Sequence, residues 1–249
     1  MNLKMVATTM VALTFACNTQ AQSHVLQVNT KKTVAPVQPT MYGLFFEDIN
    51  YAADGGLYGE LVKNRSFEFP QPLMGWQTFG NITVENDGPF ERCPHYVTLA
   101  YPGHRERRSG LVNEGYFGIG VLKGEDYRFS VWAKAPNGKA RIKVQLIDEG
   151  TLEERQDFAT AHIDINSNEW KRYEVKIHSP KTDNKARLRI FLEGQQPVSL
   201  EHISLFPVNT FRNRTNGMRR DLGQALADIH PGVFRFPGGC IVEGEELAN

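Results

Sequence analysis

The sequence predicts a multidomain fold in which an all-β sandwich interrupts an α/β domain. Three observations predict it. Residues 43–50 hold the apolar run Leu44-Phe45-Phe46 without alternation, which is typical of parallel strands buried on both faces. After Gly124, apolar residues recur at every second position in several short segments, as in antiparallel strands. Residues 208–249 then return to a helix followed by an apolar strand.

Length, composition and charge are those of an ordinary globular protein. The chain has 249 residues, enough for one large domain or two ordinary ones, and is 41% apolar and 22% charged. Lys+Arg and Asp+Glu both number 28, so the formal net charge is zero. The basic run at residues 104–108 is short and is broken by Glu106, which favours a solvated loop over a phosphate-binding patch. We therefore expect no nucleic acid as a partner.

Residues 1–21 are predicted to be a signal peptide. Lys4 supplies the positive charge, and residues 5–16 form an apolar stretch too short to span a bilayer. Two cleavage sites remain open. Thr19-Gln20-Ala21 suits an ordinary signal peptidase, whereas residues 13–17 resemble a lipoprotein box that would make Cys17 a lipid anchor. Both predict export, as a periplasmic protein, an extracellular protein or an outer-membrane lipoprotein of a bacterium.

The three cysteines allow at most one disulfide bond in the mature chain. If Cys17 is removed or lipidated, only Cys93 and Cys240 remain to pair. No two cysteines have the spacing of metal ligands, and the seven histidines are scattered. We therefore expect no structural zinc site.

The segment between the signal peptide and the sandwich, residues 22–66, is predicted to hold an N-terminal strand and a first β/α unit. The strand is expected at residues 25–28 and the apolar strand at residues 43–50. A helix is expected at residues 57–64, with Leu57 and Leu61 on one face.

The predicted sandwich covers residues 67–207 and is jelly-roll-like. Prolines and glycines divide its first half into short elements. Trp132 lies inside an alternating strand and is expected to be core, and Trp170 is expected to be packed, so neither is expected to serve as a platform for a sugar ring. Alternating strands are expected at residues 127–133, 142–146, 170–177, 188–192 and 198–206.

The last segment, residues 208–249, is predicted to be a further helix–strand unit. Asn216 is the expected N-cap of a helix over residues 217–229, which Pro231 and Gly232 end. An apolar strand at residues 233–236 follows and closes in Pro237-Gly238-Gly239-Cys240.

Polar side chains follow both predicted parallel strands. Glu47-Asp48-Ile49-Asn50 follows the first strand, and Arg235 ends the second. Parallel β/α folds carry functional side chains at these strand ends, and glycine lets the backbone approach a ligand because it has no Cβ. A carboxylate and an arginine there could hydrogen-bond the hydroxyls of a sugar. The alternatives are a solvated loop for the acids and a structural ion pair for Arg235.

Long stretches of the chain resemble one enzyme family. GLFFEDINYAADGGLYGELVKNRSFEF and VNTFRNRTNGMRRDLGQALADIHPGVFRFPGGCIVEG resemble the N-terminal part of bacterial α-L-arabinofuranosidases of glycoside hydrolase family 51. GEDYRFSVWAKAP and VSLEHISLFP, between them, resemble the carbohydrate-binding-module-like sandwich inserted in this subgroup. The resemblance covers nearly all of the mature chain.

The resemblance implies a (β/α)8 TIM barrel, interrupted by the sandwich, and a separate C-terminal sandwich. It implies retaining hydrolysis of terminal α-L-arabinofuranosyl groups in arabinose-containing polysaccharides or oligosaccharides, without a metal or an organic cofactor. Two carboxyl groups about 5–5.5 Å apart perform such a reaction. The family's two glutamates match no position in this chain, so we expect an incomplete barrel and no catalytic residue here. The alternative is a non-catalytic carbohydrate-binding protein or an inactive fragment.

The resemblance also carries over a substrate-binding set. Glu47 matches the glutamate that holds sugar hydroxyls, and Arg235 matches the arginine that supports the site. Cys240 matches a position facing the sugar, which speaks against its pairing with Cys93, while Gly238 and Gly239 shape the approach. Asn50, like Asp48, is a candidate for the same site or for a simple loop role.

Overall fold

The computed structural model describes residues 25–103, 108–150, 157–236 and 238–239, in two compact units, Met1–Gln38 and Pro39–Asn249. The described part of the first unit is exposed chain without a strand. The strand predicted at residues 25–28 is therefore wrong. Its apolar side chains are exposed, and its backbone has no neighbouring strand to satisfy its N–H and C=O groups.

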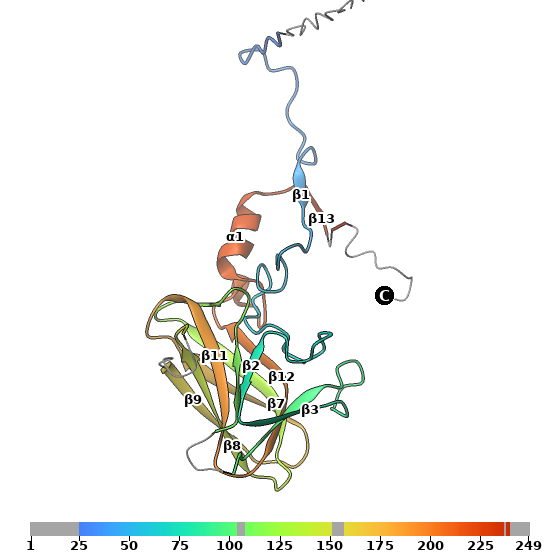
Figure 1. Ribbon diagram of the computed structural model, residues 1–249. Helices are drawn as coiled ribbons and strands as arrows, with labels where there is room; N and C mark the ends of the chain where they lie inside the picture. The colour runs from blue at the N-terminus through green and yellow to red at the C-terminus, as the bar shows by residue number, and fades with distance from the viewer. Residues whose placement is uncertain (1–24, 104–107, 151–156, 237, 240–249) are drawn as a thin grey trace, which may run out of the picture. The chain divides into compact units, whose positions relative to one another are not determined.

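Two antiparallel sheets form most of the second unit (Figure 1). One sheet has the strand order β10-β7-β12-β4-β3 and the other has the order β2-β5-β11-β8-β9, with β6 also paired to β11. The first sheet contains β3 (Asn81–Glu85), β4 (Tyr96–Ala100), β7 (Asp126–Lys134), β10 (Lys171–His178) and β12 (Val198–Pro207). The second contains β2 (Trp76–Phe79), β5 (Gly110–Asn113), β6 (Ile119–Val121), β8 (Ala140–Ile147), β9 (Asp157–Ile165) and β11 (Asp183–Glu193).

The hydrophobic core lies between these two sheets. Alternate residues of β7 point inward, so Phe129 and Val131 are fully buried, as are Ile142 and Val144 of β8 and Leu188 of β11. This alternation confirms the predicted sandwich. Neither sheet closes on itself, and no jelly-roll order is assigned.

Residues 57–64 do not form the predicted helix. The Leu61 N–H donates to the Leu205 carbonyl over 3.0 Å, and the Gly59 N–H donates to the Gly217 carbonyl over 3.2 Å. Tyr58 forms a β-bridge with Met218. The local helical pattern is overridden because the backbone hydrogen bonds go to residues that are far away in the sequence.

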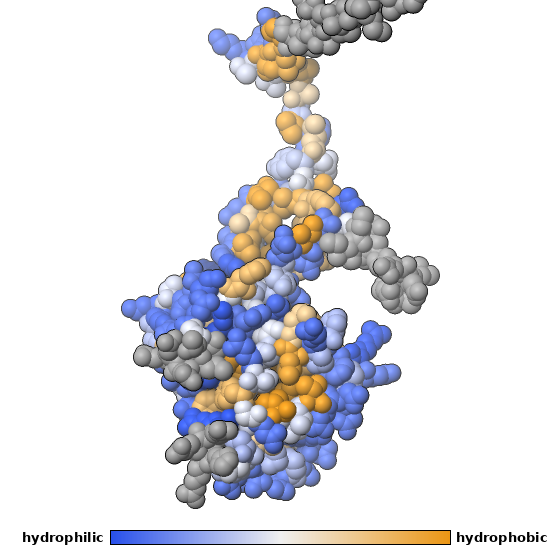
Figure 2. Space-filling view, in the orientation of Figure 1, coloured by the Kyte–Doolittle hydropathy of each residue, from blue (hydrophilic) through white to orange (hydrophobic). Residues whose placement is uncertain are grey.

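A parallel pair of short strands stands apart from the two sheets. β1 (Gly43–Phe45) pairs with β13 (Val233–Arg235) in the register Leu44 to Phe234. This confirms the predicted parallel pairing. The predicted burial is wrong, since Phe45 and Phe234 are exposed and hydrophobic surface surrounds the pair (Figure 2). Two strands do not establish a barrel, so the barrel stays a prediction.

A single α-helix is found in the described part of the chain, and it starts later than predicted. α1 covers Arg220–Asp228, with Arg219 at its N-cap position instead of Asn216. Asn216 adopts a left-handed conformation (φ 51°) in the turn that follows the short 3₁₀-helix η1 (Phe211–Asn213). Gly223 packs α1 against Phe211, since a Cβ there would lie 2.6 Å from the Phe211 side chain. None of the helical turns described here has the length and apolarity of a membrane span.

Candidate functional site

The ends of β1 and β13 bring Glu47 and a glycine pair together. The Phe46 N–H donates to the Arg235 carbonyl over 3.0 Å and extends the parallel pairing to the strand ends. A Cβ at Gly238 would lie 2.8 Å from Glu47 Cα, and one at Gly239 would lie 2.9 Å from Glu47 Oε1. Gly238 also has φ +128°, which disfavours any side chain. Only glycine lets this backbone pass so close to the Glu47 carboxylate.

Arg235 adds a cation at the same strand end. Its guanidinium lies 4.6 Å from the centroid of the Phe45 ring, a cation–π contact within β1–β13. Its side chain is exposed and forms no ion pair within the described residues, so its charge remains available. Glu47 is half-buried. A carboxylate, a guanidinium and close backbone together offer both acceptors and donors to sugar hydroxyls.

The other residues predicted for the site are not shown to join the group formed by Glu47, Arg235 and the two glycines. Asp48 Oδ1 accepts a hydrogen bond from the Ala53 N–H over 2.9 Å, which gives it a role in shaping the loop. Asn50 lies in the same exposed loop with φ 54° and is not drawn into the Glu47 group by any described contact. Cys240 lies outside the described residues, and Cys93 is a half-buried free thiol, so their relation stays a prediction.

The loop after β1 packs against the sandwich through aromatic rings. Tyr51 contacts Tyr116 and Phe117 edge to face, with ring centroids 5.2 and 5.4 Å apart. Gly55 makes room, because a Cβ there would lie 2.1 Å from the Tyr116 ring. Burial raises the pKa of Tyr116, so its hydroxyl stays protonated. This contact could not be predicted from the sequence, since nothing in the local pattern joins residue 51 to residue 116.

Glu60 fixes the next segment to β12. It is nearly fully buried, and its Oε1 accepts from the Leu205, Leu61 and Val62 N–H groups over 2.9–3.0 Å. The Ser204 hydroxyl donates to its Oε2 over 2.6 Å. Burial raises the Glu60 pKa, although the hydrogen bonds from Ser204, Leu205 and Val62 and the charge of Arg65 act in the opposite direction. The acid is a structural anchor and does not face a ligand site.

The outer face of the five-stranded sheet carries the aromatic residues that could have formed a sugar platform. Trp132 was predicted to be core, which is wrong because Val131 and Ala133 point inward and Trp132 points outward, half-buried against Phe90 at 5.2 Å. Trp170 packs against Tyr96 at 5.1 Å, as predicted. The Lys134 ammonium lies 4.8 Å from the Trp170 ring centroid. The Trp132 and Trp170 rings are therefore already in contact with the protein's own side chains.

Glu201 is the most unusual group on this face. It is 0% exposed, and its Oε2 has no hydrogen-bond partner, while Oε1 pairs with the His202 ring. Burial raises its pKa, and the nearby Glu68 carboxylate raises it further against the opposing His202. Glu201 has no route to solvent and hence no evident role in binding.

No cluster of His, Cys, Asp or Glu suited to a metal ion occurs among the residues that the structure describes.

The fold defines a carbohydrate-binding-module type of β-sandwich, joined to a strand-end group suited to hydroxyls. The comparisons agree with this class. The profile of the carbohydrate binding domain family matches residues 59–198, more than half of the chain, and the chain belongs to that family.

Curated relatives match most of the chain. The extracellular exo-α-L-arabinofuranosidase of Streptomyces chartreusis is 42% identical over 219 residues, which are 84% of this chain and 25% of that enzyme. α-L-Arabinofuranosidase 1 of Arabidopsis thaliana is 32% identical over 86% of this chain and 33% of its own length. An arabinose-bound MgGH51 α-L-arabinofuranosidase superposes with a TM-score of 0.76 at 30% identity, over 88% of this chain and 37% of that one. The chain thus spans about a quarter to a third of these proteins.

Proposed function

We propose that this chain is the substrate-positioning part of an α-L-arabinofuranosidase of glycoside hydrolase family 51. The 42% identity to the Streptomyces enzyme over 84% of the chain carries this proposal. The proposed reaction is retaining hydrolysis of terminal non-reducing α-L-arabinofuranosyl residues in plant polysaccharides. The sandwich would interrupt a (β/α)8 barrel that begins with β1 and β13.

The residues at the strand ends bind the sugar and do not cleave it. Glu47 accepts hydrogen bonds from ring hydroxyls, and Arg235 donates to sugar oxygens beside it. Gly238 and Gly239 let the backbone reach the ring, because their Cβ-free backbone already lies against Glu47. Asn50 and Cys240 complete the proposed set. Both catalytic glutamates belong to sequence that this chain does not contain.

A chimeric enzyme tests the assignment. Residues 25–239 replace the matching segment of the Streptomyces enzyme, and release of nitrophenol from 4-nitrophenyl α-L-arabinofuranoside is measured for the chimera and for the chain alone. We expect turnover from the chimera and none from the chain. A folded but inactive chimera, or turnover by the chain alone, would contradict the proposal.

The Glu47 role is tested in the same chimera. Hydrogen bonds to a charged group contribute about 1.5–3 kcal/mol, so Glu47→Gln should lower kcat/KM by roughly 10- to 100-fold. Asp54→Asn, in the loop after β1 but outside the proposed set, is the matched control and should leave kcat/KM near the parent value. Equal values for the two variants would remove Glu47 from the site.

A second candidate function rests on the family match at residues 59–198. In this alternative the chain binds arabinose-containing polysaccharide without cleaving it. Retention of the chain on insoluble arabinan, with an inactive chimera, would favour it.

For either function we propose export through the signal peptide, with Cys17 as a lipid anchor if the lipoprotein site is used.

A further inference from the structure

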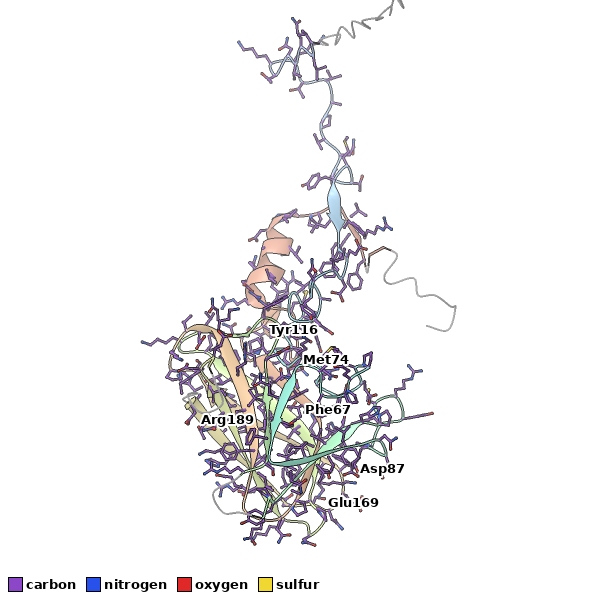
Figure 3. The ribbon with its side chains drawn as sticks, in the orientation of Figure 1. Phe67, Met74, Asp87, Tyr116, Glu169 and Arg189 are labelled. Carbon is purple, nitrogen blue, oxygen red and sulfur yellow. The ribbon has the colours of Figure 1, made fainter. Side chains whose placement is uncertain are left out.

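Three cations surround one buried ring on the outer face of the six-stranded sheet. Phe191 of β11 is only 3% exposed. The Arg108 guanidinium lies 4.6 Å from its ring centroid, the Lys143 ammonium 5.6 Å and the Arg189 guanidinium 5.9 Å. Figure 3 shows Arg189 on β11, on the other side of the sandwich from Asp87 and Glu169. Arg108, Lys143 and Arg189 therefore form a cationic cluster around the Phe191 ring, each in cation–π contact with it.

The strand register builds this cluster. Phe191 lies between Lys143 on β8 and Gly110 on β5, and Arg189 lies opposite Gln145. A Cβ at Gly110 would lie 2.5 Å from the Phe79 ring and 2.7 Å from Phe191 Cβ. The glycine therefore lets the two phenylalanines close over β5. Arg108, just before β5, is placed above them.

The positive charge of the cluster is poorly neutralised. The nearest carboxylate contact of Arg189 is with Asp157 at 4.0 Å, and its Nε donates to the side-chain Oε1 of Gln145 over 2.9 Å. Within the described residues, neither Lys143 nor Arg108 forms a hydrogen bond or ion pair, although the Lys143 charge acts on the Asp157 carboxylate and helps to lower its pKa. Burial lowers the pKa of Arg189, the Asp157 carboxylate acts in the opposite direction, and the Arg108 charge adds a smaller lowering. Such a cluster favours an anion.

A cleft of sugar size opens beside it. Arg108 lines a cavity of about 320 Å³ together with Tyr101, Pro102, Ser109, Glu193 and Gln195. Small-molecule sites begin at roughly 300 Å³, so one or two sugar rings fit. Glu193 and Gln195 can accept hydrogen bonds from hydroxyls, and Ser109 can donate or accept. The cleft thus offers hydroxyl partners next to the Arg108 guanidinium.

We propose that this corner of the six-stranded sheet binds a uronic acid residue within a polysaccharide chain. The carboxylate of the uronate lies against Lys143 and Arg108, and its hydroxyls face Glu193. The proposal rests on the carbohydrate-binding function proposed above. A polyphosphate fits less well, because Glu193 and Asp157 border the cations and would repel a closely spaced row of negative charges.

The opposite sheet is the weaker candidate for this role. There Lys134 already lies over the rings of Trp170 and Tyr96, and Phe90 packs against Trp132. The buried Glu60 further attaches residues 59–65 to β12 of that sheet. A ligand would have to displace these contacts, whereas in the described part of the chain no hydrogen bond or ion pair holds Lys143 or Arg108.

Affinity electrophoresis of the full chain tests the proposal. The gels contain glucuronoxylan, polygalacturonate, the same two polymers after chemical reduction of their carboxyl groups, or neutral arabinan. We expect retardation by at least one acidic polymer, at least about tenfold weaker after carboxyl reduction and reduced at high salt. The two acidic polymers distinguish glucuronate from galacturonate as the source of the carboxylate.

Variants assign the binding to the cluster. Lys143→Gln and Arg108→Gln should each weaken binding to the acidic polymer by about tenfold, with unchanged thermal unfolding. Arg141→Gln is the matched control, since Arg141 lies on the same face but is paired with Glu193 and Asp164 at 3.4 and 3.6 Å. Equal retardation by native and reduced polymers, equal retention by a sulfated dextran, or unaffected variants would each overturn the uronate site. Such a result leaves the arabinofuranosidase proposal intact, because the chimera measures that separately.

Discussion

The sandwich and the β1–β13 pair use similar apolar residues, and only the sandwich buries them. Phe129 of β7 is 0% exposed between two sheets, whereas Phe234 of β13 is 47% exposed in a sheet of two strands. Full burial of a large apolar side chain contributes roughly 1.5–3 kcal/mol, so the two phenylalanines differ by about half of that amount. The difference separates a part that is stabilised by its own core from a part whose strands lack a covering layer.

The largest expected effect is on the free energy of unfolding, when one phenylalanine in each of the two regions is replaced by alanine. Phe129→Ala should lower the free energy of unfolding by about 3–5 kcal/mol, because it leaves a cavity in the core. Phe234→Ala should lower it by only about 1 kcal/mol, since about half of this residue is already exposed to water. Urea unfolding followed by tryptophan fluorescence measures both. If Phe129→Ala does not fold, Ile142→Val, with an expected loss of about 0.5–1.5 kcal/mol, replaces it.

Similar losses for Phe129→Ala and Phe234→Ala would show that the two regions share one covered core. That outcome would contradict the distinction between them.

The second effect concerns the border between the two regions. Glu60→Ala removes the acceptor for three backbone N–H groups and the Ser204 hydroxyl, so the unfolding free energy should fall by roughly 1–3 kcal/mol. Ser204→Ala removes one of these donors and should cost about 1 kcal/mol. Limited proteolysis adds a second readout, since the variant should become cleavable at residues 59–65 while β7 and β12 stay protected. Protection of residues 59–65 in the variant would show that Glu60 does not hold this segment.

Much of the sandwich could be predicted from local pattern. Period-2 alternation predicted β7, β8, β10, β11 and β12, because each strand buries one face. The strand-end group was also predictable in part, since parallel strands end at the same edge and the Gly238-Gly239 pair follows β13. The structure brings both glycines against Glu47, as that reasoning expects.

The rest depends on partners far away in the sequence. Residues 57–64 have helical spacing, yet Glu60 and Leu61 bond to β12, about 145 residues later. The cluster around Phe191 exists only because β8, β11 and β5 pair in one register, and single-sequence pattern does not fix register between distant strands. The alternation of Arg187, Arg189, Phe191 and Glu193 along β11 was a visible signal of a charged outer face.

The smallest expected effect concerns the pH dependence of stability that is due to Glu201, a buried carboxyl group of the sandwich. The Glu201 pKa is raised by burial, so the folded protein keeps a proton that the unfolded chain releases near the ordinary glutamate value, about 4.3. Stability should therefore fall as pH rises from that value through the raised folded pKa, and then level off. Glu60 contributes in the same direction. Glu201→Gln should remove the part of this pH dependence of stability that is due to Glu201 and leave the part that is due to Glu60.

Urea unfolding between pH 4 and pH 8 measures this slope. Glu174→Gln is the matched control, because Glu174 is exposed on the same sheet and pairs with Arg172 in solvent. The absolute stability of Glu201→Gln is not the test, since a buried amide at Oε2 also lacks a partner. Its pH profile is the test: a slope equal to that of the parent would mean that Glu201 is ionised in the fold, and that its pocket solvates a charge better than its burial indicates.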